Sequence, residues 1–303
     1  MDSVLSNALE QFLSRHCAPS RVRTIEVDEP RAAAAALWRD VVDSGFADAL
    51  VAERHGGAGL DLRAAEAIAF ACGRHAMPLP LSITVLVRAA LLDFGVPAPE
   101  GSITVAMAAR PLDGGGLFCS AVPYGFTADW VLVETATTQR LLPTSEAVRS
   151  RAGGHGALSA DLFWSALPGH SSKPEYRDAH CVEWRAVAAA ATASNIAGAL
   201  DRLSEMTIAY ANDRCQFGKP IGKLQAIQQQ LSVMAEESFA ARMAARVGMS
   251  GESWKVDPLQ AAVAKTRAGE AAMKVGAIAH GVHGAIGATE EYDLQLLTRR
   301  LHE

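Results

Sequence analysis

The chain has little of several features that would assign a protein quickly to a class. Of its 303 residues only 6% are aromatic, and its 28 lysines and arginines are outnumbered by 33 acids, which gives a net charge of -5. Because phosphate neutralisation needs a basic surface, we predict no nucleic-acid partner. No apolar run approaches the roughly 18 residues of a membrane-spanning helix, so we predict no membrane span.

Cysteine patterns and targeting signals are also sparse. Asp2 stands where a secretory signal would carry a basic residue, and no apolar segment follows it. The histidines show no metal or catalytic-triad spacing, and we predict no metal site. The five cysteines are scattered, odd in number and without CxxC or Cys/His spacing; they are Cys17, Cys72, Cys119, Cys181 and Cys215. These absences predict a cytoplasmic protein from a reducing compartment.

Three regions that differ in composition and hydrophobic spacing follow one another along the chain. Residues 1–96 are rich in Ala and Leu at helical spacing, residues 97–181 carry short apolar runs between Gly, Pro, Asp and Ser, and residues 182–303 return to helical spacing. The predicted fold is mainly α with a small β domain, in the order N-terminal helical domain, middle β domain and C-terminal four-helix bundle.

Capping residues and glycines suggest where elements begin and end. Asp61 is the predicted N-cap of a helix that ends at Gly73. The glycines at 114–116 predict a turn and not a phosphate loop, because no Gly-Lys-Ser/Thr and no helix follow them. Pro220 is expected in the first turn of a helix.

The same signals apply to the last part of the chain. Pro258 is expected to begin a helix that runs to about Ile278, and the glycine-rich residues 281–287 to link it to a final helix over 290–300. Glu290 and Glu291 are then expected to be solvated acids in the first turn of that last helix.

The most informative segment follows the long apolar helix that reaches Tyr210. Arg214, Gln216 and Phe217 surround Gly218, so a guanidinium fork, an amide and an aromatic face are presented together. The fork can hold a phosphate through two charge-assisted hydrogen bonds, and the ring can lie against a flat base. Further on, residues 283–287 form a glycine-permitted turn that lets backbone N–H groups approach a pyrophosphate.

These two segments, in this order, resemble the C-terminal domain of acyl-CoA dehydrogenases, in which the Arg-x-Gln-Phe-Gly corner of one subunit grips the adenosine diphosphate half of a neighbouring subunit's FAD. The likeness continues over residues 219–221 and 288–292, and near the N-terminus over the Gly-Gly-x-Gly loop of residues 51–60. It implies FAD as cofactor. The cofactor-binding residues that it implies are Arg214, Gln216, Phe217, Gln225, His283 and Gly284.

Two departures bear on the turn. Ala285 replaces the family's usual second glycine, and Gly281 stands where a glutamine commonly contacts FAD. His283 is either an FAD contact or a structural histidine of the turn, and the sequence leaves both open.

The chemical half of the family's site is not recognisable. The reaction needs a carboxylate base beside the flavin. In the commonest branch this base lies in a Glu-Gly-Thr loop after the last matched helix, and the sequence ends at Glu303 without such a loop. In another branch it lies on the long helix, where an ungapped count back from Arg214 reaches Ala188. We therefore predict no catalytic residue in this chain.

The middle region departs as well. The Thr-Glu-x-x-x-Gly-Ser-Asp and Trp-Ile-(Thr/Ser) segments that hold the isoalloxazine ring in the family are missing, although residues 128–133 keep an Ala-Asp-x-x-Leu-Val strand. This combination resembles the short subunit of heteromeric (α2β2) family members that act on steroid side-chain CoA esters and hold fewer FAD molecules than subunits. The resemblance implies a homologous partner that supplies the base and binds most of the acyl-CoA, and an electron-transfer acceptor.

The expected function is therefore α,β-dehydrogenation of an acyl-CoA by a complex in which this subunit supplies cross-interface FAD contacts. Two alternatives stay open. One is a homo-oligomeric dehydrogenase with a displaced base such as Glu291, which loss of turnover with retained FAD in Glu291→Gln would favour. The other is a non-redox scaffold homologue, which absence of flavin even beside the partner would favour.

Overall fold

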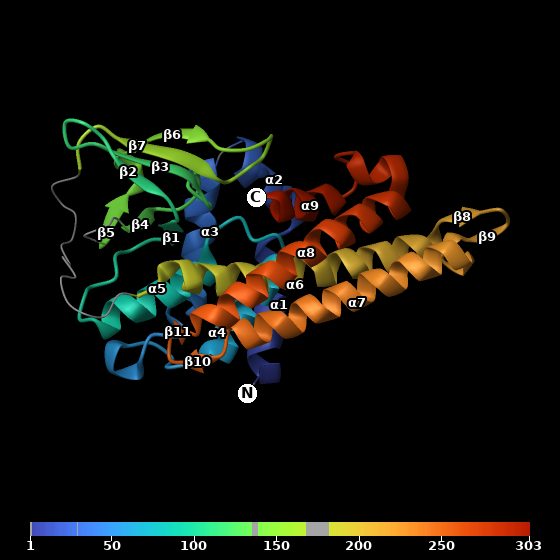
Figure 1. Cartoon of the computed structure of the whole chain (residues 1–303), viewed down its shortest axis with the longest axis horizontal. Coiled ribbons are helices and arrows are strands. Elements are labelled where there is room, and N and C mark those ends of the chain that lie inside the picture. Colours follow the sequence, from blue (N-terminus) through green and yellow to red (C-terminus); the bar gives the residue numbers. More distant parts are fainter. Residues whose placement is uncertain (1, 29, 135–138, 168–181) are drawn as a thin grey trace.

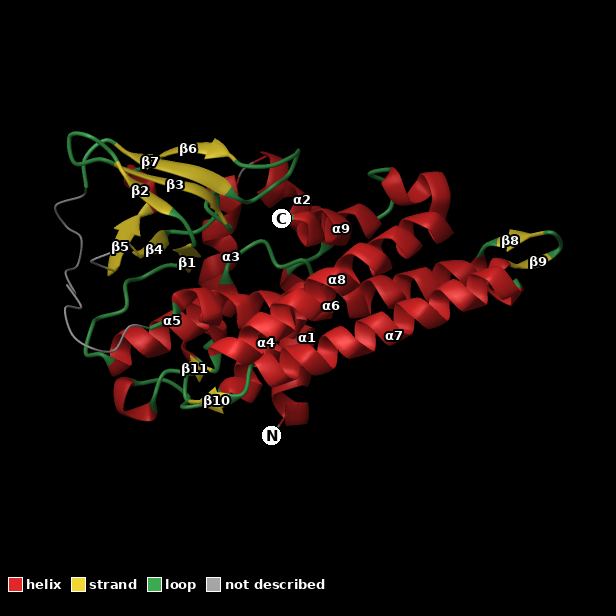
Figure 2. Cartoon of the chain, viewed as in Figure 1, coloured by secondary structure: helices red, strands yellow, loops and turns green. Residues whose placement is uncertain are grey.

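The computed structural model describes residues 2–28, 30–134, 139–167 and 182–303, and Cys181 lies outside them. Two small sheets lie at one end of the molecule, and helices pack beside them and extend away to the other end (Figures 1 and 2). The predicted fold class is confirmed, because a helical N-terminal part is followed by strands and then by a C-terminal group of helices. The helices are α1 Asp2–His16, α2 Pro19–Arg23, α3 Pro30–Ser44, α4 Leu62–Arg74, α5 Leu81–Asp93, α6 Trp184–Asp213, α7 Gln225–Gly248, α8 Pro258–His283 and α9 Leu294–His302.

The strands form two sheets in the middle of the chain. One sheet has the order β1-β4-β5, with β1 parallel to β4, and the other is antiparallel with the order β2-β3-β7-β6. Buried side chains between them, such as Leu142 and Trp164, form a separate small core. The predicted glycine turn is confirmed, since it joins β2 to β3. The strands are β1 Ile103–Ala106, β2 Ala109–Pro111, β3 Leu117–Val122, β4 Trp130–Glu134, β5 Gln139–Pro143, β6 Val148–Arg151 and β7 Ala160–Trp164.

The main core lies along α6, which packs against α4, α5, α7, α8 and α9. Pro258 begins α8 as predicted, with Asp257 capping it by accepting a hydrogen bond from the Gln260 backbone N–H. The predicted end of this helix is wrong, because α8 continues through Gly281 to His283. The helix packs against α6 and α7, and Val282 and His283 after the glycine are buried. This packing outweighs the weak helix propensity of glycine.

The predicted starts of the two neighbouring helices are also corrected. Pro220 lies in the two-residue strand β9 Lys219–Pro220, so α7 begins only at Gln225. The last helix begins at Leu294, and Glu290 and Glu291 lie exposed in the turn before it. A short 3-10 helix at Gly284–Ala288 separates this turn from α8. No helix in the described ranges is both long enough and apolar enough to cross a membrane.

Helix α4 crosses α6 at a pair of glycines. Asp61 caps α4 as predicted, accepting from the backbone N–H groups of Arg63 and Ala64. The helix does not end at Gly73 but passes through it to Arg74. A methyl group on Gly73 would lie 1.9 Å from the Asn195 carbonyl oxygen, and one on Gly198 would lie 1.9 Å from the Phe70 carbonyl oxygen. The close approach of the two backbones therefore requires glycine at both positions.

We expect Gly198→Ala to lower the free energy of unfolding by about 1–3 kcal/mol, because the new methyl group has to displace backbone atoms. Gly269→Ala in α8 is the matched control, since no heavy atom lies within 4 Å of its added carbon. The control should be neutral or stabilise by up to about 1 kcal/mol through helix propensity. Denaturant unfolding of the two variants measures this, and equal midpoints would show that the crossing does not depend on glycine.

Candidate functional site

The predicted binding segment forms a β-hairpin at the far end of the helical bundle. Strands β8 Cys215–Gln216 and β9 Lys219–Pro220 pair antiparallel and connect α6 to α7. Figure 1 shows this hairpin extending past the helix ends, at the opposite end of the molecule from the two sheets. The sequence pattern predicted a corner between two helices, and the hairpin is the form that the corner takes.

The hairpin turn presents an aromatic ring to solvent. Phe217 and Gly218 occupy the two central positions with φ of 51° and 74°. Both values are left-handed, as in the tight turns that match the twist of paired strands. Such a φ is strained for a residue with a side chain, so the turn holds Phe217 at a conformational cost. The Phe217 side chain is 87% exposed.

The other predicted residues of the hairpin are exposed as well. Arg214 lies where α6 ends, and its carbonyl accepts a 2.8 Å hydrogen bond from the Ile221 N–H across the base of the hairpin. Within the described ranges no acid is paired with the Arg214 guanidinium. Gln216 is exposed on β8, and Gln225 is exposed at the first position of α7. A cation, two amides and a ring are thus available at this end of the bundle.

The predicted turn at the end of α8 meets the base of this hairpin. Ala211, Ile221 and Val282 form a small buried cluster that is separate from the main core. Next to it the Tyr210 ring stacks on the His283 ring at a centroid distance of 4.4 Å. The structure therefore brings together the two segments that lie far apart in the sequence. Gly284 follows at once, with φ of 63° and no atom near its open side.

His283 itself is buried, with 4% of its surface exposed. Its Nδ1 lies 2.7 Å from the Ala279 carbonyl oxygen, so Nδ1 carries the proton and Nε2 is an acceptor. Nε2 has no hydrogen-bond partner among the described residues. Burial lowers the pKa of His283 below its usual value, and nearby His280 adds to this. His283 is thus neutral and packed, whereas the other predicted residues are exposed.

The middle of α6 borders a small chamber between the β domain and α4. The cavity measures about 120 Å³, and the polar side chains of Tyr124, Ser159, Asn195, Arg300 and Glu303 line it together with apolar ones. Ligand pockets usually have volumes of roughly 300–1,000 Å³, so an isoalloxazine ring with an acyl thioester does not fit here. The Arg300 guanidinium lies 5.6 Å from the centre of the Tyr124 ring. Burial raises the pKa of Tyr124 to about 12.

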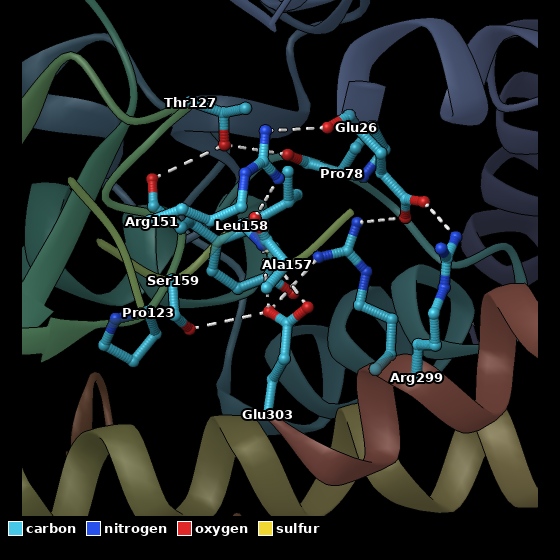
Figure 3. A network of polar contacts seen from close by, with 12 residues as sticks. Glu26, Pro78, Pro123, Thr127, Arg151, Ala157, Leu158, Ser159, Arg299 and Glu303 are labelled. Atoms are coloured by element: carbon cyan, nitrogen blue, oxygen red, sulfur yellow. Dashed lines mark hydrogen bonds and ion pairs between the residues drawn. The ribbon is translucent and has the colours of Figure 1, made fainter. Parts of the chain in front are cut away.

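A buried carboxylate holds the side chains of this chamber in place, as Figure 3 shows. Glu26 is 2% exposed and accepts hydrogen bonds from Arg299 at 2.7 Å and from Arg300 at 2.8 Å, one on each oxygen. It lies in a single π-helical turn at Thr24–Asp28. The Arg151 guanidinium donates to the Glu26 carbonyl at 3.0 Å. The network therefore ties the N-terminal helices, the β domain and α9 together.

Glu303 completes the network on the side of the β domain. Its carboxylate accepts hydrogen bonds from the Leu158 backbone N–H at 3.2 and 3.3 Å and lies 3.6 Å from Arg300. Sequence patterns gave no signal for this cluster, because its members come from three distant regions. Glu26 stands among other acids in Glu-Val-Asp-Glu, and this pattern predicts a surface residue.

Neither candidate position for a base places a carboxylate beside the chamber. Ala188 lies on α6, partly buried against the main core, and has no titratable group. Glu291 is exposed in the turn before α9 and does not line the chamber beside Tyr124. No group of three or more His, Cys, Asp or Glu residues in the described chain is arranged to hold a metal ion.

Comparison with known proteins assigns the N-terminal and the C-terminal helical part to one protein family. Residues 3–108 match the model of the acyl-CoA dehydrogenase N-terminal domain, and residues 185–302 match that of the C-terminal domain. The chain is 27% identical to the acyl-CoA dehydrogenase IpdE2 of Mycobacterium tuberculosis, over 99% of this chain and 90% of that protein.

Solved structures agree over nearly the whole chain. The Tcur3481-Tcur3483 steroid ACAD (G363A variant) superposes with a TM-score of 0.79 at 26% identity, covering 99% of this chain and 91% of its counterpart. The ChsE4-ChsE5 complex from Mycobacterium tuberculosis superposes with a TM-score of 0.77 at 23% identity and the same coverage, and at that identity it supports the fold alone.

The buried neutral histidine predicts a pH effect on stability. In the unfolded chain a histidine takes up a proton below about pH 6.5, whereas the lowered pKa keeps His283 neutral in the folded chain. The free energy of unfolding should therefore fall as pH drops below that value, by at most about 1.4 kcal/mol per pH unit for one proton. His283→Phe should remove this share of the fall.

Thermal denaturation from pH 7.5 to 5.5, compared between the natural chain and His283→Phe, measures the effect. Burial also lowers the pKa of His75, so the natural protein loses stability from a second source. The His283 share is the difference between the two proteins. Identical slopes would show that His283 takes up its proton as readily in the folded chain as in the unfolded chain.

Proposed function

The chain belongs to the acyl-CoA dehydrogenase family of FAD-dependent oxidoreductases, and we propose that it is the subunit of a heteromeric enzyme that binds FAD across an interface without supplying the catalytic base. In the proposed heterotetramer a homologous partner provides the base and the isoalloxazine pocket. The complex removes hydrogens from the α and β carbons of an acyl-CoA, and the flavin, when bound, accepts the hydride.

The observation that carries this proposal is the position of the exposed hairpin. Arg214 and Phe217 lie at the end of the bundle that is farthest from this chain's own sheets (Figure 1). A dinucleotide whose ring lay against these sheets would be out of reach of the same chain's hairpin. The hairpin therefore suits a dinucleotide that belongs to another subunit. Its free guanidinium fits a pyrophosphate, and its exposed ring fits an adenine.

The small size of the chamber supports the second half of the proposal. Arg300, Tyr124 and Glu303 occupy space between α6 and the β domain, and the remaining 120 Å³ is too small for the flavin ring. The family's cofactor thus fits the hairpin end of this chain and does not fit the chamber end. We derive no proton abstraction within this chain, because Ala188 has no basic group and Glu291 lies away from the chamber.

The outward faces of α7 and α8 support assembly with another subunit. They expose Val233 and Val247 on one helix and Val263 and Met273 on the other. On α8, Gly276 has open space beside it. A face of apolar and small residues along two long helices suits close packing against another helical surface, and a solvated helix would carry more charge there.

For the substrate we propose an acyl-CoA with a bulky, steroid-like acyl group. The support comes from the solved relative at 26% identity, which is a steroid ACAD. Most of the acyl-CoA would be bound by the partner subunit, since the chamber of this chain is too small for it. Reoxidation of the flavin requires an electron-transfer acceptor that docks on the complex.

Replacing Arg214 tests the proposal in the complex co-expressed with its homologous partner. Arg214→Ala removes a charge-assisted contact of about 1.5–3 kcal/mol, so the FAD dissociation constant should rise roughly 10- to 100-fold. Arg246→Ala is the control, because it removes another exposed arginine from the opposite end of α7. Flavin absorbance after gel filtration and fluorescence titration measure occupancy and affinity. Full FAD affinity in Arg214→Ala would refute the cross-interface role.

A further inference from the structure

We propose that Tyr210 and His283 are positioning residues for the dinucleotide, because their stacked rings fix the Arg214 hairpin relative to the Gly284 turn. The inference rests on the proposed function, since it assumes that hairpin and turn bind one ligand together. Neither ring is argued to touch the ligand. Each acts by holding a neighbour along the backbone in place.

Tyr210 connects the two segments through two hydrogen bonds, one made by its backbone carbonyl and one by its ring hydroxyl. The Arg214 N–H donates to the Tyr210 carbonyl at 2.8 Å, one helical turn earlier. The Tyr210 hydroxyl in turn donates to the His283 carbonyl at 3.3 Å. Gly284 is the next residue, and its positive φ begins the turn. Tyr210 therefore contacts both segments, with its backbone carbonyl bonded to Arg214 and its ring hydroxyl bonded to the residue before Gly284.

Three aromatic rings make this connection stiff. Tyr210 and His283 are nearly parallel, with an angle of 28° between their planes and centroids 4.4 Å apart. Tyr292, in the turn before α9, lies 4.9 Å from His283 and meets Tyr210 edge-on at 6.1 Å. Offset-stacked and edge-to-face pairs are the favoured aromatic geometries. The three rings, from α6, α8 and the segment before α9, therefore hold three separate parts of the chain at a fixed distance.

The environment of His283 indicates that its ring acts by packing. Nδ1 is used within α8 by the Ala279 carbonyl, and Nε2 is buried with no partner in the described part of the chain. An acceptor in this position neither reaches solvent nor offers a contact to a ligand. His283 therefore contributes to the positioning through the flat shape of its ring, which packs on Tyr210. A phenylalanine at 283 should therefore keep the positioning role, and an alanine should lose it.

The location of the rings makes a local effect separable from unfolding. They lie beside the small Ala211, Ile221 and Val282 cluster and outside the main core along α6. Loss of a ring at this end should loosen the hairpin and the turn while the crossing of α4 and α6 stays intact. Local stability of this kind differs between parts of one protein. The FAD dissociation constant should therefore rise, while the melting temperature of the FAD-free complex should stay nearly the same.

The test uses the complex co-expressed with the homologous partner. Tyr210→Leu and His283→Ala remove one ring each, and the loss of a stacked pair should raise the FAD dissociation constant by roughly 10-fold. Tyr210→Phe keeps the ring without the hydroxyl and should change it only about 2- to 3-fold. His283→Phe should restore near-natural affinity. Ile208→Ala, at a 42% exposed position of the same helix, is the control and should change nothing.

Three readouts separate the outcomes: FAD affinity by fluorescence titration, the FAD dissociation rate, and the melting temperature of the complex. Faster FAD loss at an unchanged melting temperature of the FAD-free complex, with rescue by phenylalanine at either position, supports the positioning role. If Arg214→Ala weakens FAD binding while Tyr210→Leu and His283→Ala do not, the positioning role is wrong and the proposed function stands. If Arg214→Ala itself has no effect, both are wrong. Should Tyr210→Leu fail to assemble, His283→Ala against His283→Phe decides.

Discussion

The buried carboxylate of Glu26 is the interaction on which the rest of this structure depends. A charge removed from water needs opposite charges at close range, and Arg299 and Arg300 supply them, one to each oxygen. The same contact brings α9 against the β domain, which places Arg300 over Tyr124 and Glu303 on the Leu158 backbone. A flavin ring bound in this region would need an open space there. Here the chain's own side chains occupy it.

This arrangement separates two tasks that one subunit often combines. The interior next to the β domain serves cohesion of the fold, whereas the exposed polar and aromatic groups gather at the hairpin end of the bundle (Figure 1). A phenylalanine ring that is exposed to water in a strained turn is unfavourable in an isolated chain, and the Arg214 guanidinium lies exposed beside it. They are explained if a neighbouring molecule covers them. The apolar outward faces of α7 and α8 are explained by the same assembly.

Much of the fold could be predicted from the sequence, because it depends on local signals. The Asp61 cap, the Pro258 start and the change from helical to strand texture all act through neighbouring residues. Gly73 misled the prediction because its role is set by α6, which crosses it from more than a hundred residues away. The hairpin at Phe217 could not be predicted, because its strands have only two residues each, too few for a periodic pattern.

The site divides in the same way. Arg214, Gln216, Phe217 and Gln225 were predicted from a contiguous motif and are exposed together. The contact between Tyr210 and His283 and the network around Glu26 join distant segments, so composition and spacing carry no trace of them. His283 was left open between a ligand contact and a structural histidine. Its burial and its bond to Ala279 describe a packed ring beside the turn.

The most direct measurement is the number of FAD molecules per polypeptide in the complex purified with its homologous partner. Flavin absorbance set against the amount of each chain gives this ratio without any assumption about substrate. The account predicts fewer FAD molecules than chains, and no stable flavin when this chain is purified alone. One FAD for every chain, or a yellow and active protein made only of this polypeptide, would contradict it.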